Sequence, residues 1–117
     1  MSARAVVEEG GHPFVDCGPL RLDLLAYRLR RESSSQELTL TEARLLETLM
    51  GQPGRVFTRA ELESLLPCGG TGERALTAAI SRLRRPLLAL GCEGCLQAVR
   101  GQGYTFVCPT EDDPADD

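Results

Sequence analysis

The sequence predicts an α+β fold in which an N-terminal antiparallel sheet precedes a three-helix core and a C-terminal β-hairpin. Three observations lead to this prediction. Apolar residues alternate with polar ones in residues 14–31, recur at spacings of three and four in residues 41–90, and alternate again in residues 96–107. With 117 residues, the chain is long enough for one such domain.

One domain spanning residues 14–108 is expected between two ends of different character. Residues 1–13 contain two adjacent glycines and a proline and are predicted to form a flexible leader, in which His12 is exposed and inert. Residues 109–117 hold five acidic residues and no basic one, a composition typical of a disordered tail.

Short strands are expected first. Alternating apolar residues and a Gly18-Pro19 turn predict two or three antiparallel strands within residues 14–31. A polar loop at residues 32–37 and a further short strand at Leu38–Leu40 should follow. One face of these strands is expected to be buried.

Two helices follow in quick succession. The first should start at a Thr41 cap and end at the glycines and proline of residues 51–54. The second is marked by Thr58 and Glu61, which have the spacing of a capping box, and it should end at Pro67. Two helices joined by so short a connection indicate a helix-turn-helix.

A third helix is predicted from Glu73 to about Leu90. Its apolar residues alternate between spacings of four and three and form a single stripe. Pro86 cannot donate to the carbonyl of Arg82, so the helix should kink or end near Arg85. The residues that fall outside the stripe are small, polar or basic: Thr77, Ala78, Ser81, Arg82, Arg84 and Arg85.

The last predicted element is a hairpin with strands at Leu96–Val99 and Tyr104–Val107. A four-residue tip, residues 100–103, would pair Val99 with Tyr104. The two glycines of the tip allow a tight turn.

Five cysteines in a chain without a secretion signal indicate reduced thiols in a cytosolic protein. Extending the hairpin register places Cys95 opposite Cys108, and directly opposed residues have Cβ atoms about 4.5–5.5 Å apart. Cys92, Cys95 and Cys108 are therefore weak candidates for a disulfide or a metal site that would alter the angle of the hairpin. The interpretation we favour is that they are small buried thiols, with no metal and no cofactor.

The charge of the chain argues at first against nucleic-acid binding. It is −4 overall, whereas a DNA-binding domain usually presents a basic surface. Acidic residues gather at the two ends, however, and between Cys17 and Cys108 twelve arginines outnumber nine acidic residues, which gives +3. Four of these arginines concentrate near the third helix and the hairpin: Arg82, Arg84, Arg85 and Arg100.

Several classes of protein are not expected. No apolar run approaches the roughly 18 residues of a membrane span, and acidic residues interrupt the N-terminus before a signal peptide could form. No Ser/His/Asp arrangement, phosphate-binding loop or pair of carboxylates on a regular element indicates an enzyme. A soluble, cytoplasmic protein is expected.

Four stretches of the sequence form a specific combination. They are Leu40-Thr-Glu-Ala-Arg-Leu-Leu, Gly54-Arg-Val-Phe-Thr-Arg-Ala-Glu-Leu, Ile80-Ser-Arg-Leu-Arg-Arg and Val99-Arg-Gly-Gln-Gly-Tyr-Thr-Phe. Together they resemble the effector domain of OmpR/PhoB-type response regulators, over about residues 20–107. The resemblance implies a winged helix-turn-helix, in which the third helix enters the major groove of double-stranded DNA and the hairpin, or wing, reaches the adjacent minor groove.

The candidate site residues follow from this resemblance and from side-chain chemistry. Arg85, beside Arg84, can contact a phosphate without reading sequence. Arg100 can project into a narrow, electronegative minor groove. By position, the resemblance implies DNA contacts from Arg74, Arg82, Arg84 and Arg100, and it places Thr77, Ala78 and Ser81 where base edges are read.

The sequence departs from the family pattern at several positions. Thr77 replaces the usual Asp, and Ala98 replaces a Thr that often contacts the DNA backbone. The loop after Pro67 lacks the aromatic residue that often belongs to a surface contacting RNA polymerase. The receiver domain of the family is missing from the sequence, which predicts either an excised effector domain or a stand-alone protein controlled in another way.

Two hypotheses remain open. The first is a sequence-specific bacterial transcription regulator, acting in the cytoplasm at the nucleoid. The resemblance implies one half-site per subunit and a second copy of the chain on a tandem half-site. The second is an atypical winged helix that has lost strong base readout and serves as a protein-interaction module for RNA polymerase or another regulator. The overall acidity and the small Ala78-Ala79 face favour the second, and thiol sensitivity is a variant of the first.

Overall fold

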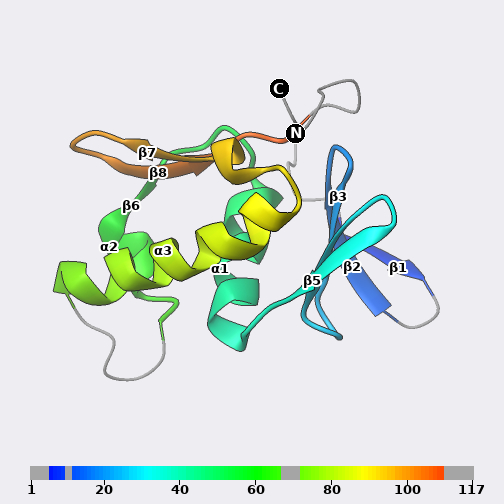
Figure 1. Ribbon diagram of the computed structural model, residues 1–117. Helices are drawn as coiled ribbons and strands as arrows, with labels where there is room; N and C mark the ends of the chain where they lie inside the picture. Colours follow the sequence, from blue (N-terminus) through cyan, green and yellow to red (C-terminus); the bar gives the residue numbers. More distant parts are fainter. Residues whose placement is uncertain (1–5, 10–11, 67–71, 110–117) are drawn as a thin grey trace.

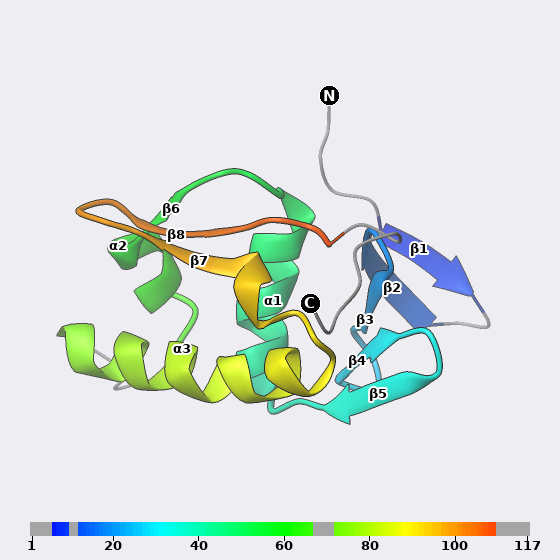
Figure 2. The same ribbon diagram turned by 45° about the horizontal axis from the view of Figure 1, so that its top comes forward.

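The computed structural model describes residues 6–9, 12–66 and 72–109, in which two sheets flank three α-helices (Figure 1). The first helix lies between the N-terminal sheet and the C-terminal hairpin, and the third helix runs along one side of the molecule (Figures 1 and 2). Within this part of the chain, no helix is both long enough and apolar enough to cross a membrane. The predicted α+β winged helix is confirmed.

The N-terminal sheet is an antiparallel meander whose strands follow sequence order. They are β1 (Val6–Glu9), β2 (His12–Cys17), β3 (Leu20–Asp23), β4 (Arg28–Arg31) and β5 (Ser34–Glu37). Val15, Leu22 and Leu29 stand opposite one another on three adjacent strands and are fully buried. Because side chains alternate along a strand, Arg21 and Arg30 lie on the outer face. The sheet therefore offers one face to the core.

This sheet extends further in both directions than the sequence predicts. β1 and the start of β2 lie in the stretch expected to be a flexible leader, and β5 occupies the stretch expected to be a polar loop. No strand forms at Leu38–Leu40, because Leu40 already belongs to the first helix. Backbone hydrogen bonds to a neighbouring strand stabilise a polar segment such as Ser34–Glu37, and an apolar pattern cannot reveal such pairing.

Helix α1 (Leu40–Gly51) is capped by Thr39 rather than by the expected Thr41. The N–H of Glu42 donates to Thr39 Oγ1 at 3.2 Å, and the N–H of Thr39 donates to Glu42 Oε1 at 2.9 Å. This reciprocal pair is a capping box, which needs an acid or amide three residues after the cap. The expectation is wrong because Thr41 has no such residue at that distance.

Helix α2 (Arg59–Glu63) begins at the capping box expected for Thr58 and Glu61, which is confirmed. The N–H of Thr58 donates to Glu61 Oε1 at 2.8 Å, and the N–H of Glu61 donates to Thr58 Oγ1 at 3.1 Å. The regular helix ends at Glu63. The predicted end at Pro67 lies outside the described residues.

Helix α3 (Gly72–Ala89) has nearly the predicted extent of Glu73 to about Leu90. It continues through Pro86, so of the two outcomes expected near Arg85, a kink or an end, the end is wrong. Proline removes one backbone hydrogen bond, but the N–H of Leu90 donates to the Pro86 carbonyl at 3.3 Å and the helical bonding resumes. Burial of the turn that follows offsets the lost bond. The predicted apolar stripe is confirmed, since all five of its members are buried: Leu76, Ile80, Leu83, Leu87 and Leu90.

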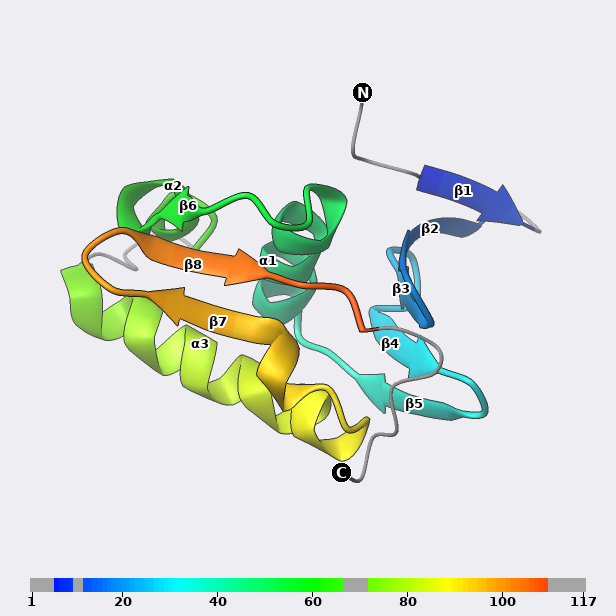
Figure 3. The same ribbon diagram turned by 90° about the horizontal axis from the view of Figure 1, so that it is seen from above.

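The C-terminal hairpin, or wing, belongs to a second sheet with strand order β6-β8-β7. Its strands are β6 (Phe57–Thr58), β7 (Leu96–Val99) and β8 (Gly103–Phe106), and a 3-10 turn, η1 (Glu93–Cys95), leads into β7. Seen from above, the wing lies along α3 (Figure 3). The short strand β6 connects it to the start of α2.

The register of the wing differs by one residue from the expected one. Val99 stands opposite Gly103, not Tyr104, so the tip holds three residues rather than four. Cys95 consequently lies opposite Val107, whose N–H donates to the Cys95 carbonyl at 2.9 Å. The expected pairing of Cys95 with Cys108 is therefore wrong.

Gly103 explains this shift. The sequence places it in the tip because glycine favours turns, yet it is the first residue of β8 and has φ +153°. A Cβ atom at Gly103 would collide with the carbonyl of Phe57. Glycine is thus required for the close approach of β6, a constraint from a distant segment that local turn chemistry does not contain.

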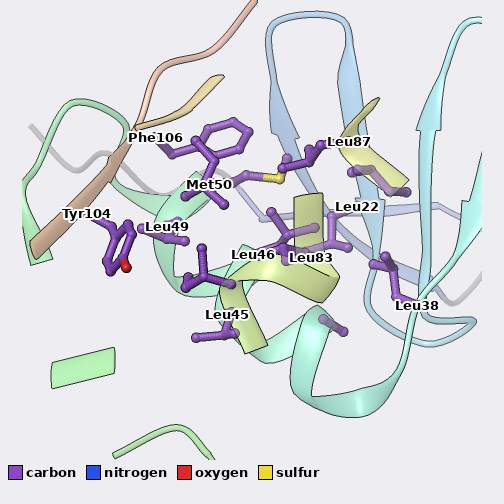
Figure 4. Close-up of a cluster of buried hydrophobic side chains, with 14 of the residues drawn as sticks. Leu22, Leu38, Leu45, Leu46, Leu49, Met50, Leu83, Leu87, Tyr104 and Phe106 are labelled. Atoms are coloured by element: carbon purple, nitrogen blue, oxygen red, sulfur yellow. The ribbon is translucent and has the colours of Figure 1, made fainter. Parts of the chain in front are cut away.

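The core is aliphatic, as expected, and α1 supplies its centre. Leu45, Leu46 and Leu49 are fully buried. Figure 4 shows these side chains in one cluster with Leu83 of α3 and Phe106 of the wing. The same cluster includes the inner face of the N-terminal sheet, so sheet, helices and wing share one core.

A disulfide between Cys17 and Cys108 joins the N-terminal sheet to the segment that follows the wing. Their Cα atoms are 5.2 Å apart, although 91 positions separate them in sequence. The segment after β8 leads from the wing to the N-terminal sheet (Figure 3), where a Cβ at Gly18 would collide with the Pro109 carbonyl. The expectation of five reduced thiols is wrong in this structure, because chain length and spacing do not reveal that two distant cysteines meet.

Candidate nucleic-acid interface

Most residues predicted to contact DNA share one face of α3. Successive residues of an α-helix turn by about 100°, so residues three, four or seven apart point the same way. This face is opposite the buried stripe that holds Leu76 and Leu83. Its members are exposed, except for half-buried Ala78: Arg74, Thr77, Ala78, Ser81, Arg82 and Arg85.

The arginines of this face differ from three arginines elsewhere in the described chain. Arg82 and Arg85 make no ion pair with another described residue, whereas three other arginines each pair with a carboxylate. Those pairs are Arg21 with Asp16 at 2.8 Å, Arg28 with Glu37 at 3.2 Å, and Arg55 with Glu61 at 2.8 Å. The positive charge on α3 is thus available to an anionic partner.

Arg84 lies on the flank of the helix, away from the exposed face. Its Nη1 donates to the backbone carbonyl of Leu96 at 2.8 Å, and the side chain is half-buried. Leu96 is the first residue of β7. Arg84 therefore fixes the position of the wing relative to α3.

The tip of the wing presents Arg100 to solvent. The N–H of Gln102 donates to the Val99 carbonyl at 2.9 Å and closes a β-turn. Gly101 occupies the third position of this turn with φ +73°, a conformation that glycine adopts at little cost. Arg100 is thus carried at the end of a short, well-defined turn.

Arg59 is a candidate that the sequence analysis missed. It lines a cavity of about 610 Å³ between the start of α2 and the wing, together with Arg100 and Gln102. Its guanidinium carbon lies 5.6 Å from the centroid of the Tyr104 ring. Within the described residues, Arg59 Nη1 is buried and has no hydrogen-bond partner.

A signal for Arg59 was present in the sequence. Arg59 is the first residue of α2, where the positive end of the helix dipole disfavours a cation. A basic residue directly after a capping threonine is therefore locally unfavourable, and an anionic partner would offset that cost. The position of Arg59 beside the wing became known only from the fold.

A second hollow, of about 420 Å³, lies on the side of α3 that faces the start of α1. Ala75, Ala78 and Ala79 line it, together with Leu66 and Arg82. The small side chains of α3 leave this space open. It adjoins the face that carries Ser81 and Arg85.

The metal candidates do not form a ligand set in the structure. Cys108 is bonded to Cys17, while Cys92 and Cys95 are thiols outside any disulfide. Across the described residues, no group of three or more His, Cys, Asp or Glu side chains is arranged to hold a metal ion.

Comparison with known proteins identifies the family. The profile described as "Transcriptional regulatory protein, C terminal" matches residues 33–106. The chain belongs to the OmpR/PhoB family of DNA-binding effector domains.

Relatives with established names support this membership. The phosphate regulon transcriptional regulatory protein PhoB of Rhizobium meliloti is 38% identical over 96 residues, which cover 77% of this chain and 40% of that protein. PhoB of Escherichia coli is 35% identical over 110 residues, 91% of this chain and 44% of that protein. The chain thus spans less than half the length of these OmpR/PhoB relatives.

Solved structures show the same fold. The DNA-binding domain of the response regulator AdeR, in complex with an intercistronic region, gives a TM-score of 0.69 at 31% identity and covers 78% of this chain and 96% of that one. The DNA-binding domain of CpxR from E. coli also gives 0.69, at 27% identity, with 82% and 97% covered. The OmpR/PhoB fold accounts for the sheet, helices and wing described above.

Proposed function

We propose that this OmpR/PhoB domain binds double-stranded DNA as a transcription regulator, with α3 in the major groove and Arg100 in the adjacent minor groove. The observation that carries the proposal is the exposed face of α3, whose arginines make no ion pair with another described residue. A helix about 10–12 Å across fits a groove about 12 Å wide. The AdeR domain, which was solved with DNA, supports the same role.

The side chains of the face make two kinds of contact with DNA, to phosphates and to base edges. Arg74, Arg82 and Arg85 contact phosphates, which sets the register of the helix without reading sequence. Thr77 and Ser81 offer hydroxyls to base edges. Ala78 brings only a methyl group, which suits contact with a thymine methyl. Base readout is therefore modest.

The wing supplies the second contact. Arg100 reaches into the minor groove, where a narrow groove concentrates negative potential. Arg59 binds the phosphate beside it, because its buried Nη1 lacks a described partner and the residue lines the same cavity as Arg100. Arg84 holds the wing at the required angle through its bond to the Leu96 carbonyl.

A mobility-shift titration at two salt concentrations tests this proposal, after selection of a binding site from random duplex. Affinity should fall steeply with salt, because each neutralised phosphate releases counterions. Arg82→Ala and Arg100→Ala should each weaken binding by about 1–3 kcal/mol. Arg30→Ala is the matched control, since Arg30 lies on the outer face of the N-terminal sheet. Equal losses in all three variants, or no shift at low salt, would contradict the proposal.

The hollow beside Ala78 favours a second candidate function, a protein-interaction module. Its lining is mainly apolar, and Leu40, at the start of α1, is 47% exposed. RNA polymerase or another regulator is the proposed partner. Under this alternative, Ala78→Arg abolishes activation of transcription while leaving DNA affinity unchanged; under the first proposal, the same substitution alters DNA affinity.

The location of the domain in the cell and the number of copies on DNA are proposals as well. We propose that it acts in the cytoplasm at the nucleoid, with two copies on tandem half-sites. A footprint one helical turn longer at saturation than at low occupancy supports the tandem arrangement. A footprint of constant length shows that one copy suffices.

A further inference from the structure

Four cysteines gather where the end of the wing meets the N-terminal sheet. Cys17 and Cys108 form a disulfide, and Cys92 and Cys95 are thiols outside any disulfide. None of them belongs to the proposed DNA-binding face. The inference drawn from them stands apart from the proposed function, and its test uses no DNA.

The N-terminal sheet brings two of these cysteines to the same side. Cys17 stands opposite Leu20, and Leu20 stands opposite Arg31, so the three residues form one row across β2, β3 and β4. Paired residues of neighbouring strands share a face. From that face, Arg31 Nη1 donates to Cys92 Sγ at 3.1 Å and to the Leu90 carbonyl at 3.1 Å.

The wing brings the other two together. Cys95 stands opposite Val107, directly beside Cys108, and the N–H of Val107 donates to its carbonyl at 2.9 Å. A surface pocket of about 280 Å³ is lined by Cys92, Cys95 and Cys108. One residue of the disulfide and both remaining cysteines therefore border the same small space.

Cys92 has the environment of a reactive thiol. Its pKa is lowered from 9.0 to about 7, chiefly because of a hydrogen bond with the Cys95 side chain and also because of the Arg31 guanidinium. Burial acts in the opposite direction and limits the shift. A thiolate, not a thiol, attacks disulfides, so a large fraction of Cys92 is competent at neutral pH.

We propose that these four cysteines form an intramolecular thiol–disulfide exchange site with two alternative bonds, Cys17–Cys108 and Cys92–Cys95. First, the Cys92 thiolate attacks Cys108 Sγ. A Cys92–Cys108 bond forms, the Cys17–Cys108 bond breaks, and Cys17 leaves as a thiolate that takes up a proton. After this step Cys92 is oxidised, in a mixed disulfide with Cys108, and Cys95 is still a thiol.

In the second step Cys95 loses its proton and attacks Cys92 Sγ. A Cys92–Cys95 bond forms, the Cys92–Cys108 bond breaks, and Cys108 takes up a proton. The dithiol is oxidised and the original disulfide is reduced, so no external oxidant is needed. The exchange releases the C-terminal end of the wing from the sheet while the total number of disulfides stays constant.

Disulfide mapping tests the proposal in the full chain carrying Cys68→Ser, which removes the fifth thiol. The oxidised protein is incubated without added thiol at about pH 8.5, quenched with acid and alkylated under denaturing conditions. Trypsin then yields separate peptides that carry Cys17, the Cys92/Cys95 pair, and Cys108. Over time, a Cys92–Cys95 bond should appear together with alkylated Cys17 and Cys108.

Two variants identify the steps. Cys95→Ser removes the second attacking thiol, so the Cys92–Cys108 bond should accumulate while Cys17 becomes alkylated. Cys92→Ser should keep the Cys17–Cys108 bond at all times. Cys95 is half-buried, so its serine variant should remain folded, which circular dichroism checks. If neither the Cys92–Cys95 bond in the parent nor the Cys92–Cys108 bond in Cys95→Ser appears, the proposal is overturned.

Discussion

Arg59 places a positive charge where a helix favours a negative one. It is the first residue of α2, and its Nη1 is buried without a hydrogen-bond partner among the described residues. Both conditions are unfavourable in the free protein. A phosphate in the cavity beside the wing would balance the charge and accept a hydrogen bond. Arg59 would then destabilise the free protein and stabilise its complex with DNA.

Arg59→Ala should therefore separate stability from affinity. We expect the free energy of unfolding to stay the same or to rise by a few tenths of a kcal/mol. DNA affinity should fall, and the slope of log K against log salt should decrease by about 1, as for the loss of one phosphate contact. Chemical denaturation and salt titrations measure the two effects. A fall in stability with unchanged affinity would show that Arg59 is purely structural.

Cys92 provides a prediction on pH dependence. Its pKa is lowered in the folded chain from 9.0 to about 7, so its ionisation stabilises the folded state. This stabilisation is fully present above pH 9 and is lost as the pH falls through 7. Unfolding free energies of the parent and of Cys92→Ser should therefore diverge as the pH rises from 7 to 9. Arg31→Ala should shift the thiolate absorbance midpoint of Cys92 upward, whereas a midpoint already near 9 in the parent contradicts the prediction.

At the scale of elements, the capping of α1 distinguishes two nearby threonines. Thr39→Ala removes one half of a capping box and should cost about 1 kcal/mol of stability. Thr41→Ala is the matched control, because Thr41 lies inside the helix, and it should be nearly neutral. Urea denaturation measures both. A larger loss of stability in Thr41→Ala than in Thr39→Ala would show that Thr41 caps the helix.

The two glycines of the wing give a second prediction at this scale. Gly101→Ala meets open space at φ +73° and should cost about 1–2 kcal/mol. Gly103→Ala collides with the Phe57 carbonyl, so it should cost more and should disrupt the pairing of β6 with β8. Thermal unfolding and amide exchange in residues 57–58 measure these effects. Equal costs would mean that β6 moves aside freely.

The elements show where sequence reasoning succeeds. The stripe of α3 and the capping box of Thr58 and Glu61 depend on spacing within a few residues, and both were predicted. Strand β5 and the place of Gly103 depend on distant partners, and both were missed. Local pattern thus identifies an element, whereas its exact limits depend on what it packs against.

The candidate site follows the same division. The exposed face of α3 and Arg100 follow from helical spacing and from the resemblance to the OmpR/PhoB family, so sequence alone identified them. The bond from Arg84 to the wing and the position of Arg59 beside Arg100 arise from tertiary packing. The local sequence does not predict either contact. Its one indication is Arg59 itself, a positive charge at the start of α2, where the helix dipole disfavours it.

At the scale of the whole molecule, the Cys17–Cys108 disulfide should dominate stability. It closes a loop of 91 positions, and the chain-entropy treatment of such a loop gives about 4–5 kcal/mol. Cys17→Ser with Cys108→Ser should lower the unfolding free energy by an amount of this order. Treatment of the parent with a reductant should have the same effect, while it should leave the double variant unchanged. A reductant effect of similar size in both would assign the stability to another disulfide.

The position of this disulfide also determines how the domain carries mechanical load. Cys17 and Cys108 mark the points where the chain enters and leaves most of the core, with Cα atoms 5.2 Å apart. A pulling force applied at the two termini passes directly through the sulfur bridge and bypasses the helices and the wing. While this bond is intact, tension along the chain leaves α3 in place, and once it is broken, the same tension reaches both β3 and β8.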